Sequence, residues 1–416
     1  MDGREIKNIF LLEKELYFLI AIRSERHLIK KSNPMWKTVD YYCFQAKNIY
    51  NAANYIVRQE FINNGKWIKY YELDKIMRSN LTYYELGSQA SQMVLRLLEK
   101  NWKSFFIGIK LYSMGNKNNF LGKPNLPKYK NQNGRSSLML TNNLFKIKNG
   151  EIYFSWKPLN KFSGIKTRIN KETLQIRFIP FGSCYYMEII YKENIKEPKN
   201  CKNIIGIDLG INNFATISNN IGIQSIIING RIIKSMNQNY NRLKSKIQKE
   251  TGMKWCNKLQ NVTDKHQRKI DYFMHCSSKY IIDYCLQNSI DTIIIGKNDK
   301  WKQNSKMGKK NNQNFEHIPY QKFISKLKYK CENQGINFIE TEESYTSGTS
   351  FLDNELPIKE NYDKSRRKKR GLFVSNNGIK INADLNGSYQ IIKKVFPNAF
   401  EQRDRGCSLH PVRTNV

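Results

Sequence analysis

The sequence of 416 residues lacks the short patterns that most metal and redox sites require. None of its eight cysteines forms a C-x-x-C pair, and its five histidines form neither an H-x-H nor an H-E-x-x-H pattern. Local spacing therefore builds neither a zinc ribbon, nor a dithiol redox motif, nor a histidine-based metal site. We expect the cysteines to be ordinary reduced thiols of a cytoplasmic protein.

Long hydrophobic runs are also missing. No apolar stretch reaches the roughly 18–20 residues that a membrane span needs. Acidic and basic residues stand among the first fifteen positions, which does not fit a secretory signal. Hydrophobic residues still make up 40% of the chain, enough for a packed core. We expect a soluble intracellular protein of two or three domains with no membrane partner.

Negative charge is scarce. The chain has 70 Lys and Arg against 35 Asp and Glu, a formal net charge of +35. A field of that strength attracts polyanions, and a phosphate backbone is the partner that it fits best. Binding to a membrane surface would favour one basic amphipathic helix or a polybasic anchor, whereas these cations run through the whole length. We therefore expect a nucleic-acid-binding protein, associated with the nucleoid.

The first half of the chain changes from helical to strand periodicity. Apolar residues recur at helical spacing from Lys37 to Phe61 and from Ser88 to Leu111, and the aromatic residues there fit a packing core better than a base-stacking platform. A loop rich in Gly, Pro, Asn and Lys follows, from Gly115 to Gly134. Alternating segments at 151–156, 165–180 and 185–191 come next, with a hairpin turn at Phe181-Gly182-Ser183. Residues 1–200 are thus predicted to be a β-module with a helical insertion.

The second half has the element order of the RNase H-like fold. Three short strands are predicted first, then long polar helices, and then strands and helices in alternation. The predicted strands are Asn203–Asp208, Asn213–Ser218, Gly222–Ile228, Asp291–Ile295 and Ile336–Thr341, and the predicted helices are Arg231–Lys249, Asn257–Gln287, Tyr320–Asn333 and Ala383–Val395. The tail from Glu401 is expected to be poorly ordered.

Two aspartates stand where nucleases of this fold need carboxylates. Such enzymes use three acidic groups to hold two divalent ions, and Mg²⁺ prefers carboxylate and water oxygens. Asp208 ends the apolar run Ile204–Ile207, and Asp384 opens the last predicted helix. Locally, a turn-capping Asp and a helix N-cap explain the two residues equally well. Their joint position in this element order favours the catalytic interpretation.

Three blocks of the second half resemble the TnpB family, the transposon-encoded RNA-guided nucleases related to type V CRISPR effectors. The blocks are GIDLGINNFATIS at 206–218, YTSGTSFLDNE at 345–355 and INADLNGSYQII at 381–392. The segments SQASQMVLRLLEKNWKSFF (88–106) and GKPNLPKYK (122–130) resemble the recognition-lobe helix of the family and the loop after it. The resemblance covers most of the chain.

The resemblance implies a multidomain α/β protein. It consists of an N-terminal β-barrel-like wedge domain with a helical recognition-lobe insertion, followed by an RNase H-like (RuvC) nuclease domain. The expected ranges are 1–35 and 116–200 for the two wedge parts, 36–115 for the recognition lobe, 201–400 for the RuvC domain and 401–416 for a C-terminal tail. The implied activity is RNA-guided cleavage of double-stranded DNA beside a short motif. The implied partners are a guide RNA from the transposon end and the target DNA; the sequence leaves monomer and dimer open.

One departure from the family concerns zinc. TnpB proteins usually carry a four-cysteine zinc ribbon before the last block. Here the matching positions hold Ser350, Asp353, Val374 and Asn377, and the loop KSRRKKR (364–370) between them is basic. We expect a zinc-ribbon-like insertion without ligands at 346–380, and no bound zinc.

The second departure concerns the third carboxylate. The usual family glutamate follows the fourth strand, where this chain has Gly296. A relocated glutamate in Glu-x-Tyr-Thr-Ser occurs in some relatives, including the eukaryotic Fanzors, and Glu343 matches it. Side chains alternate along a strand, so Glu342 is the alternative metal ligand to Glu343.

The resemblance then implies catalytic, metal-binding residues Asp208, Glu343 and Asp384 with two Mg²⁺ ions, for which Mn²⁺ can substitute. The alternative is a nuclease-dead, RNA-guided DNA-binding repressor of the same ancestry.

Overall fold

The computed structural model describes residues 20–115, 117, 120–198, 200–297, 318–369, 371–401 and 409–416. The chain divides into two compact units, one spanning Ile20–Glu193 and the other containing Asn194–Val416. The predicted wedge, recognition-lobe and RuvC boundaries stay predictions. Residues 1–19 of the predicted first wedge part lie outside the described residues. No helix within the described ranges is long and apolar enough to cross a membrane.

The described residues of the first unit contain four α-helices. They are α2 (Trp36–Asn64), α3 (Tyr70–Met77), α4 (Leu81–Leu86) and α5 (Ser88–Ser113). The two long ones cover both predicted helices. Trp102 of α5 is completely buried, and its indole N–H donates to Asn54 of α2 at 3.1 Å. The aromatic stripe of α5 is therefore a packing core, as the periodicity predicted.

The strands of this unit lie in two sheets. The four-stranded sheet has the order β1-β7-β6-β2, so the chain before the helices pairs with the chain after them. Its strands are β1 (Ile20–Ile29), β2 (Leu138–Thr141), β6 (Thr173–Phe181) and β7 (Cys184–Asn194), and the smaller sheet holds β3 (Phe145–Lys148), β4 (Glu151–Phe154) and β5 (Ile165–Lys166). Gly182, at a φ of 56°, turns β6 into β7 as predicted. The barrel-like arrangement stays a prediction.

One predicted strand of the first unit is wrong in extent. Residues 165–180 are not one strand, because the chain leaves β5 after Lys166 and enters β6 only at Thr173. The Thr167 hydroxyl accepts a hydrogen bond from the Ile169 N–H at 3.2 Å and donates to Glu25 at 2.8 Å. Such local side-chain bonds give the backbone an alternative to a strand ladder, which the alternation of residue types does not reveal.

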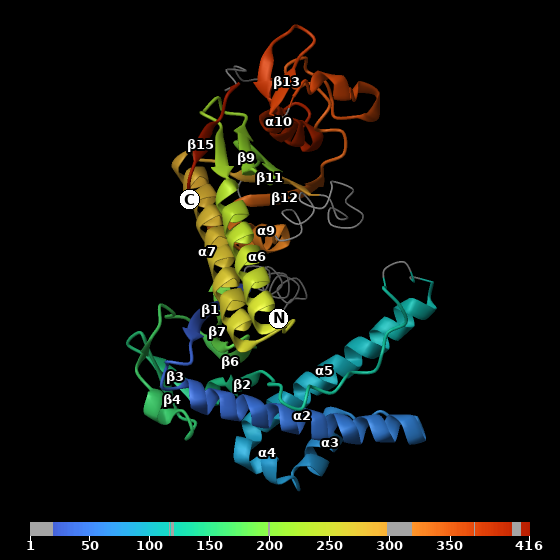
Figure 1. The fold of residues 1–416 in the computed structure, drawn as a ribbon, viewed down its shortest axis with the longest axis vertical. Coiled ribbons are helices and arrows are strands. Elements are labelled where there is room, and N and C mark those ends of the chain that lie inside the picture. Colours follow the sequence, from blue (N-terminus) through green and yellow to red (C-terminus); the bar gives the residue numbers. More distant parts are fainter. Residues whose placement is uncertain are drawn as a thin grey trace, which may run out of the picture. The chain divides into compact units, whose positions relative to one another are not determined.

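The second unit is built on a mixed six-stranded sheet with the order β12-β11-β8-β9-β10-β15. Figure 1 labels β9, β11, β12 and β15 of this sheet. Its strands are β8 (Ile204–Leu209), β9 (Asn213–Asn219), β10 (Ile226–Asn229), β11 (Thr292–Lys297), β12 (Asn337–Glu342) and β15 (Val412–Thr414). β8, β9 and β10 form the predicted antiparallel meander, and β11 and β12 add in parallel beyond β8. The prediction of a poorly ordered tail is wrong for Val412–Thr414, because β15 pairs in parallel with β10.

Helices pack on both sides of this sheet. α6 (Arg231–Thr251) and α7 (Asn257–Gln287) follow β10 and lie side by side, and α9 (Tyr320–Gln334) connects to β12. On the other face, α10 (Ala383–Val395) packs on β8 and β9. The approach of α10 is close enough that a Cβ at Gly206 would come within 2.3 Å of the Ser388 carbonyl oxygen. Only glycine fits in β8 at that point.

Candidate active site

Asp208 lies near the end of β8, on the face that α10 covers. Gly206 precedes it on the same face, since side chains alternate along a strand. The Ser388 hydroxyl donates to the Gly206 carbonyl oxygen at 2.7 Å and accepts from the Ser218 N–H at 3.0 Å. These bonds fix α10 against β8 and β9. A Cβ at Gly387 would lie 3.1 Å from Asp208 Oδ2, so a small residue of α10 leaves room for the carboxylate.

Asp384 is the second residue of α10. The N-cap is Asn382, whose side-chain oxygen accepts hydrogen bonds from the N–H groups of Asp384 and Leu385. The Asp384 carboxylate is thus not needed for capping, which removes the local structural explanation for this aspartate. It accepts instead from the Asn213 amide at 2.7 Å and pairs with the Arg367 guanidinium at 3.1 Å.

Glu343 follows β12 directly, and its side chain fills the space above Gly296 of β11. A Cβ at Gly296 would lie 2.5 Å from both Cγ and Oε1 of Glu343. A turn holds this placement: Thr346 donates its N–H and its hydroxyl to the Glu343 carbonyl oxygen, and Tyr345 has a left-handed φ of 66°. The acidic side chain above β11 therefore comes from the neighbouring strand end.

The other two glutamates of this segment lie elsewhere. Glu342, the predicted alternative to Glu343, is exposed, and Glu340 is exposed and forms an ion pair with Lys297 at 3.1 Å. Glu343 is half-buried. The neighbouring carboxylates thus have different surroundings, as the alternation of the strand predicts.

One cavity of about 610 Å³ brings the predicted residues together. Asp208, Glu343 and Asp384 all line it, together with Arg231, Arg367 and Arg413. As the side chains lie, no group of three His, Cys, Asp or Glu residues in the described part of the chain could hold a metal ion. In this arrangement the two carboxylate oxygens of Asp384 accept hydrogen bonds from Arg367 and Asn213.

Burial raises the pKa of two of these acids. Burial is the main cause that raises the pKa of Asp208 well above its usual range; Glu343 and Asp384 raise it further and Arg367 opposes them. Burial also raises the pKa of Glu343 to about 8, against a smaller opposing effect of Lys394. The Oε1 atom of Glu343 is buried and has no hydrogen-bond partner among the described residues. A buried, unpartnered carboxylate oxygen beside a second acid suits a cation.

Sequence reasoning missed three residues around this cavity. Arg367 was visible only as part of a basic loop, Asn213 as part of a family block, and Arg413 as part of the tail. Arg413 donates to the Asn213 side-chain oxygen at 2.8 Å, and Asn213 donates to Asp384. Their contacts depend on long-range folding, which local patterns do not report.

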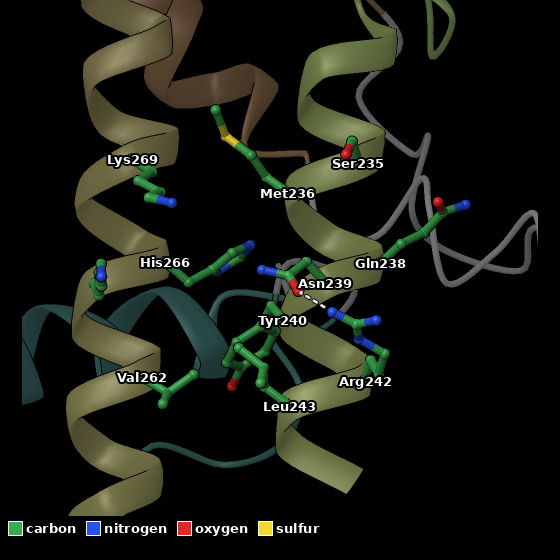
Figure 2. A pocket seen from close by; sticks show the side chains of 11 residues that line it. Ser235, Met236, Gln238, Asn239, Tyr240, Arg242, Leu243, Val262, His266 and Lys269 are labelled. Carbon is green, nitrogen blue, oxygen red and sulfur yellow. Dashed lines mark hydrogen bonds between the residues drawn. The ribbon is translucent and has the colours of Figure 1, made fainter. Parts of the chain in front are cut away.

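A second cavity, of about 650 Å³, lies between α6 and α7 in the same unit (Figure 2). Tyr240 and His266 stack at its centre with ring centroids 4.4 Å apart, and the Tyr240 hydroxyl bonds Thr263. Arg242, Lys265 and Lys269 add positive charge, and none of the eleven lining residues is acidic. We call this cavity the hairpin groove.

Residues other than cysteine stand at the four positions that match zinc ligands, namely Ser350, Asp353, Val374 and Asn377. Ser350 is completely buried, and its hydroxyl oxygen accepts from the Asp353 N–H at 3.2 Å. The Asp353 carboxylate accepts from the Asn376 N–H at 2.9 Å. Val374 lies in the strand β13 (Leu372–Val374), which pairs with β14 (Lys380–Asn382). A hydroxyl, one carboxylate, an apolar side chain and an amide do not fit a structural zinc site.

Two family models match parts of this chain. Residues 188–302 match the OrfB_IS605 family model ("Probable transposase"), and residues 320–391 match the model "Cas12f1-like, TNB domain". The "TnpB-like protein ORF457" of Acidianus two-tailed virus is 21% identical over 390 residues, which cover 83% of this chain and 81% of that protein.

Two solved structures are also similar. The Cas12f1-sgRNA-target DNA complex has 15% identity and a TM-score of 0.37, over 89% of this chain and 98% of that one. The mini-RNA-guided endonuclease CRISPR-Cas_phi3 has 11% identity and a TM-score of 0.46, over 99% and 98%. The two family-model matches and the viral relative support a TnpB-family protein.

Proposed function

We propose that the chain is an RNA-guided endonuclease that cuts double-stranded DNA at the cavity lined by Asp208, Glu343 and Asp384. One observation carries the proposal. Three carboxylates from β8, from the end of β12 and from the start of α10 line the same cavity, and Glu343 fills the space above Gly296. The third acid is thereby present although the usual position is glycine.

The donor set fits divalent cations of the Mg²⁺ type. Carboxylate oxygens are their preferred protein ligands, and the Glu343 Oε1 atom is buried without a partner within the described residues. Asp208, Glu343 and Asp384 would hold the ions, which would activate a water and stabilise the leaving oxygen of the cleaved phosphodiester. Mn²⁺ offers the same charge and similar ligand preferences.

The chain's own residues have the remaining tasks. Ser388 keeps α10, and with it Asp384, in place on the strand of Asp208. Asn213 orients the Asp384 carboxylate through its amide at 2.7 Å. Arg231, Arg367 and Arg413 at the cavity wall would bind and orient the phosphates of the DNA strand, because guanidinium groups pair well with phosphate oxygens.

The guide RNA is the second expected partner. The net charge of +35 supports binding of long phosphate backbones, and the hairpin groove offers a defined contact. The Cas12f1 structure named above is a complex with sgRNA and target DNA. We infer that sequence is read by base pairing and that the protein holds the heteroduplex by its backbone.

A cleavage assay tests the proposal. The protein, purified with its guide RNA, should cut a plasmid that carries the matching target in Mg²⁺ or Mn²⁺, and EDTA should stop the cutting. The nuclease-dead alternative predicts tight, guide-dependent target binding without cleavage in either metal. Binding of RNA with no dependence on a matched target would contradict both.

A further inference from the structure

The zinc-ribbon-like insertion, residues 346–380, has a buried arginine at its centre. Arg366 is only 8% exposed, although it belongs to the basic loop at 364–370. Both terminal nitrogens of its guanidinium pair with the Glu355 carboxylate, at 2.7 and 2.9 Å. A charge is buried at such a place only when it is paired and hydrogen-bonded.

The same guanidinium joins distant parts of the insertion. Its Nη2 atom donates to the carbonyl oxygens of Gly348 at 3.0 Å and Asn361 at 2.7 Å. Glu355 in turn accepts from the Ser350 N–H at 2.7 Å. The side chain also packs over the Phe373 ring, 5.6 Å from its centroid. A four-cysteine zinc site would connect the segment of Ser350 and Asp353 with the segment of Val374 and Asn377. Through Glu355 and Phe373, Arg366 connects the same two parts of the chain.

A second contact bridges the same two segments. Asp353 occupies one of the four positions that match zinc ligands, and its carboxylate accepts from the N–H of Asn376, the neighbour of Asn377. The Asp353 carboxylate lies 3.9 Å from the Arg366 guanidinium. We define Arg366, Glu355 and Asp353 as the arginine cluster.

The arginine cluster is coupled by short chain segments to the candidate active site. The residue after Arg366 is Arg367, which pairs with Asp384. Gly348, which Arg366 holds, follows Thr346 and Ser347, and both line the cavity. The Asn386 side chain of α10 donates to the Thr349 carbonyl oxygen at 2.8 Å and accepts from the Phe351 N–H at 3.0 Å.

We propose that the arginine cluster does the structural work of the missing zinc, so that the insertion folds without metal and Arg366 positions Arg367 beside Asp384. Arg366 acts through its neighbours and is a positioning residue. The folding part of this proposal is independent of nuclease activity, and the positioning part rests on the proposed function.

A double-mutant cycle tests the folding part by hydrogen exchange of the full-length protein. Removing one partner of a buried ion pair leaves an uncompensated charge, so Arg366→Met and Glu355→Met should each speed exchange in residues 346–380 on the order of a hundredfold. The double variant should exchange no faster than the worse single variant. Lys368→Met, an exposed position of the same loop, is the matched control and should behave as wild type. Additive effects, or wild-type exchange in Arg366→Met, would overturn the proposal, as would stoichiometric zinc in the purified protein.

Target cleavage tests the positioning part. Arg366→Met should lower the rate of cleavage at least tenfold while affinity for the matched target stays within twofold, and Arg366→Lys, which keeps the charge but loses the fork, should recover part of the rate. Loss of binding together with cleavage would show general unfolding and overturn the positioning role. If the wild type never cleaves, the proposed function fails, and the exchange cycle still decides the folding part.

Discussion

The side chain of Glu343 stands where the side chain of residue 296 would be. Because the two positions lie on neighbouring parallel strands, with Gly296 paired to Thr341, a glutamate at either one can direct its carboxylate into the same space. The chemistry of the site then depends on the location of the carboxylate and not on the strand that supplies it.

Alanine substitution tests whether the three acids are needed for cleavage and whether the neighbouring Glu342 is not. Asp208→Ala, Glu343→Ala and Asp384→Ala should each lower cleavage of a matched plasmid by more than roughly a hundredfold, since outer-shell changes around metal ligands alone reduce activity ten- to a hundredfold. Target binding should persist, because phosphate and heteroduplex contacts lie elsewhere. Glu342→Ala is the matched control. Full activity in Glu343→Ala, or a loss in Glu342→Ala that equals it, would contradict the assignment.

A substitution at Gly296 tests the shared space directly. In Gly296→Ala the new Cβ meets Glu343 at 2.5 Å and Ile391 Cδ1 at 2.7 Å, so the carboxylate must move. We expect cleavage to fall at least tenfold and stability to drop by about 1–3 kcal/mol, the usual effect of overpacking. In the exchange variant Gly296→Glu with Glu343→Ala, cleavage should exceed that of Glu343→Ala alone. Wild-type cleavage by Gly296→Ala would show that the Glu343 carboxylate is not needed above β11.

At this scale the sequence predicts the acids better than their surroundings. Asp208, Glu343 and Asp384 stand in short local patterns, and the structure brings them to one cavity. Arg366 and Arg367 are neighbours in one basic run, yet one is buried against Glu355 and the other borders the cavity. No local pattern separates them, because burial depends on which residues the folded chain packs around each arginine.

Among the elements, the hairpin of α6 and α7 carries the clearest candidate for RNA contact. Cations line the hairpin groove beside neutral donors and acceptors, namely Ser235, Gln238 and Asn239. The cations can pair with RNA phosphates. The neutral side chains can form hydrogen bonds with the 2′-hydroxyl of RNA, which is both donor and acceptor. We therefore expect the groove to contact the guide RNA.

Charge removal in the groove should weaken guide binding more than the same change elsewhere. Replacing Arg242, Lys265 and Lys269 by Ser should reduce RNA affinity roughly tenfold to a hundredfold and lower the slope of log affinity against log salt by about two to three, since each phosphate contact contributes about 0.7–0.9. The control replaces Lys244, Lys249 and Lys254 of the same hairpin region, which are not among the residues lining the groove. Equal losses in both triple variants would indicate diffuse attraction, and a loss for DNA alone would assign the groove to the target.

Element prediction succeeded where periodicity is long and failed where contacts are short or distant. The long helices α2, α5 and α7 and the strands of the meander were all predicted. The tail strand β15 was not, because three residues carry no periodic signal and gain their order only by pairing with β10. The two short helices α3 and α4 fell inside a segment predicted only as part of the recognition lobe.

For the molecule as a whole, cleavage and folding of the insertion should differ in their dependence on metal. Cleavage should require a divalent ion, whereas the insertion at 346–380 should keep its fold in a chelator, because the arginine cluster and not a metal holds it. We expect EDTA to abolish cleavage, and hydrogen exchange in 346–380 to remain unchanged within about twofold. The control adds Mg²⁺ back and should restore cleavage in full. Faster exchange of the insertion in EDTA, reversed only by zinc, would show a metal-dependent fold.

The charge of the whole chain leads to the last prediction. With 70 basic against 35 acidic residues, the protein is expected to copurify with bound RNA when cells are lysed. A guided nuclease should retain one structured RNA from its own transposon end, whereas a general nucleic-acid binder retains a mixture. We expect sequencing of the RNA that copurifies from cells carrying the full locus to give one dominant species with a fixed start and a defined guide segment. Binding of that RNA should weaken steeply between about 50 and 200 mM salt as counterion release loses its driving force. Heterogeneous fragments without such enrichment would contradict the guided function and leave charge-driven binding as the explanation.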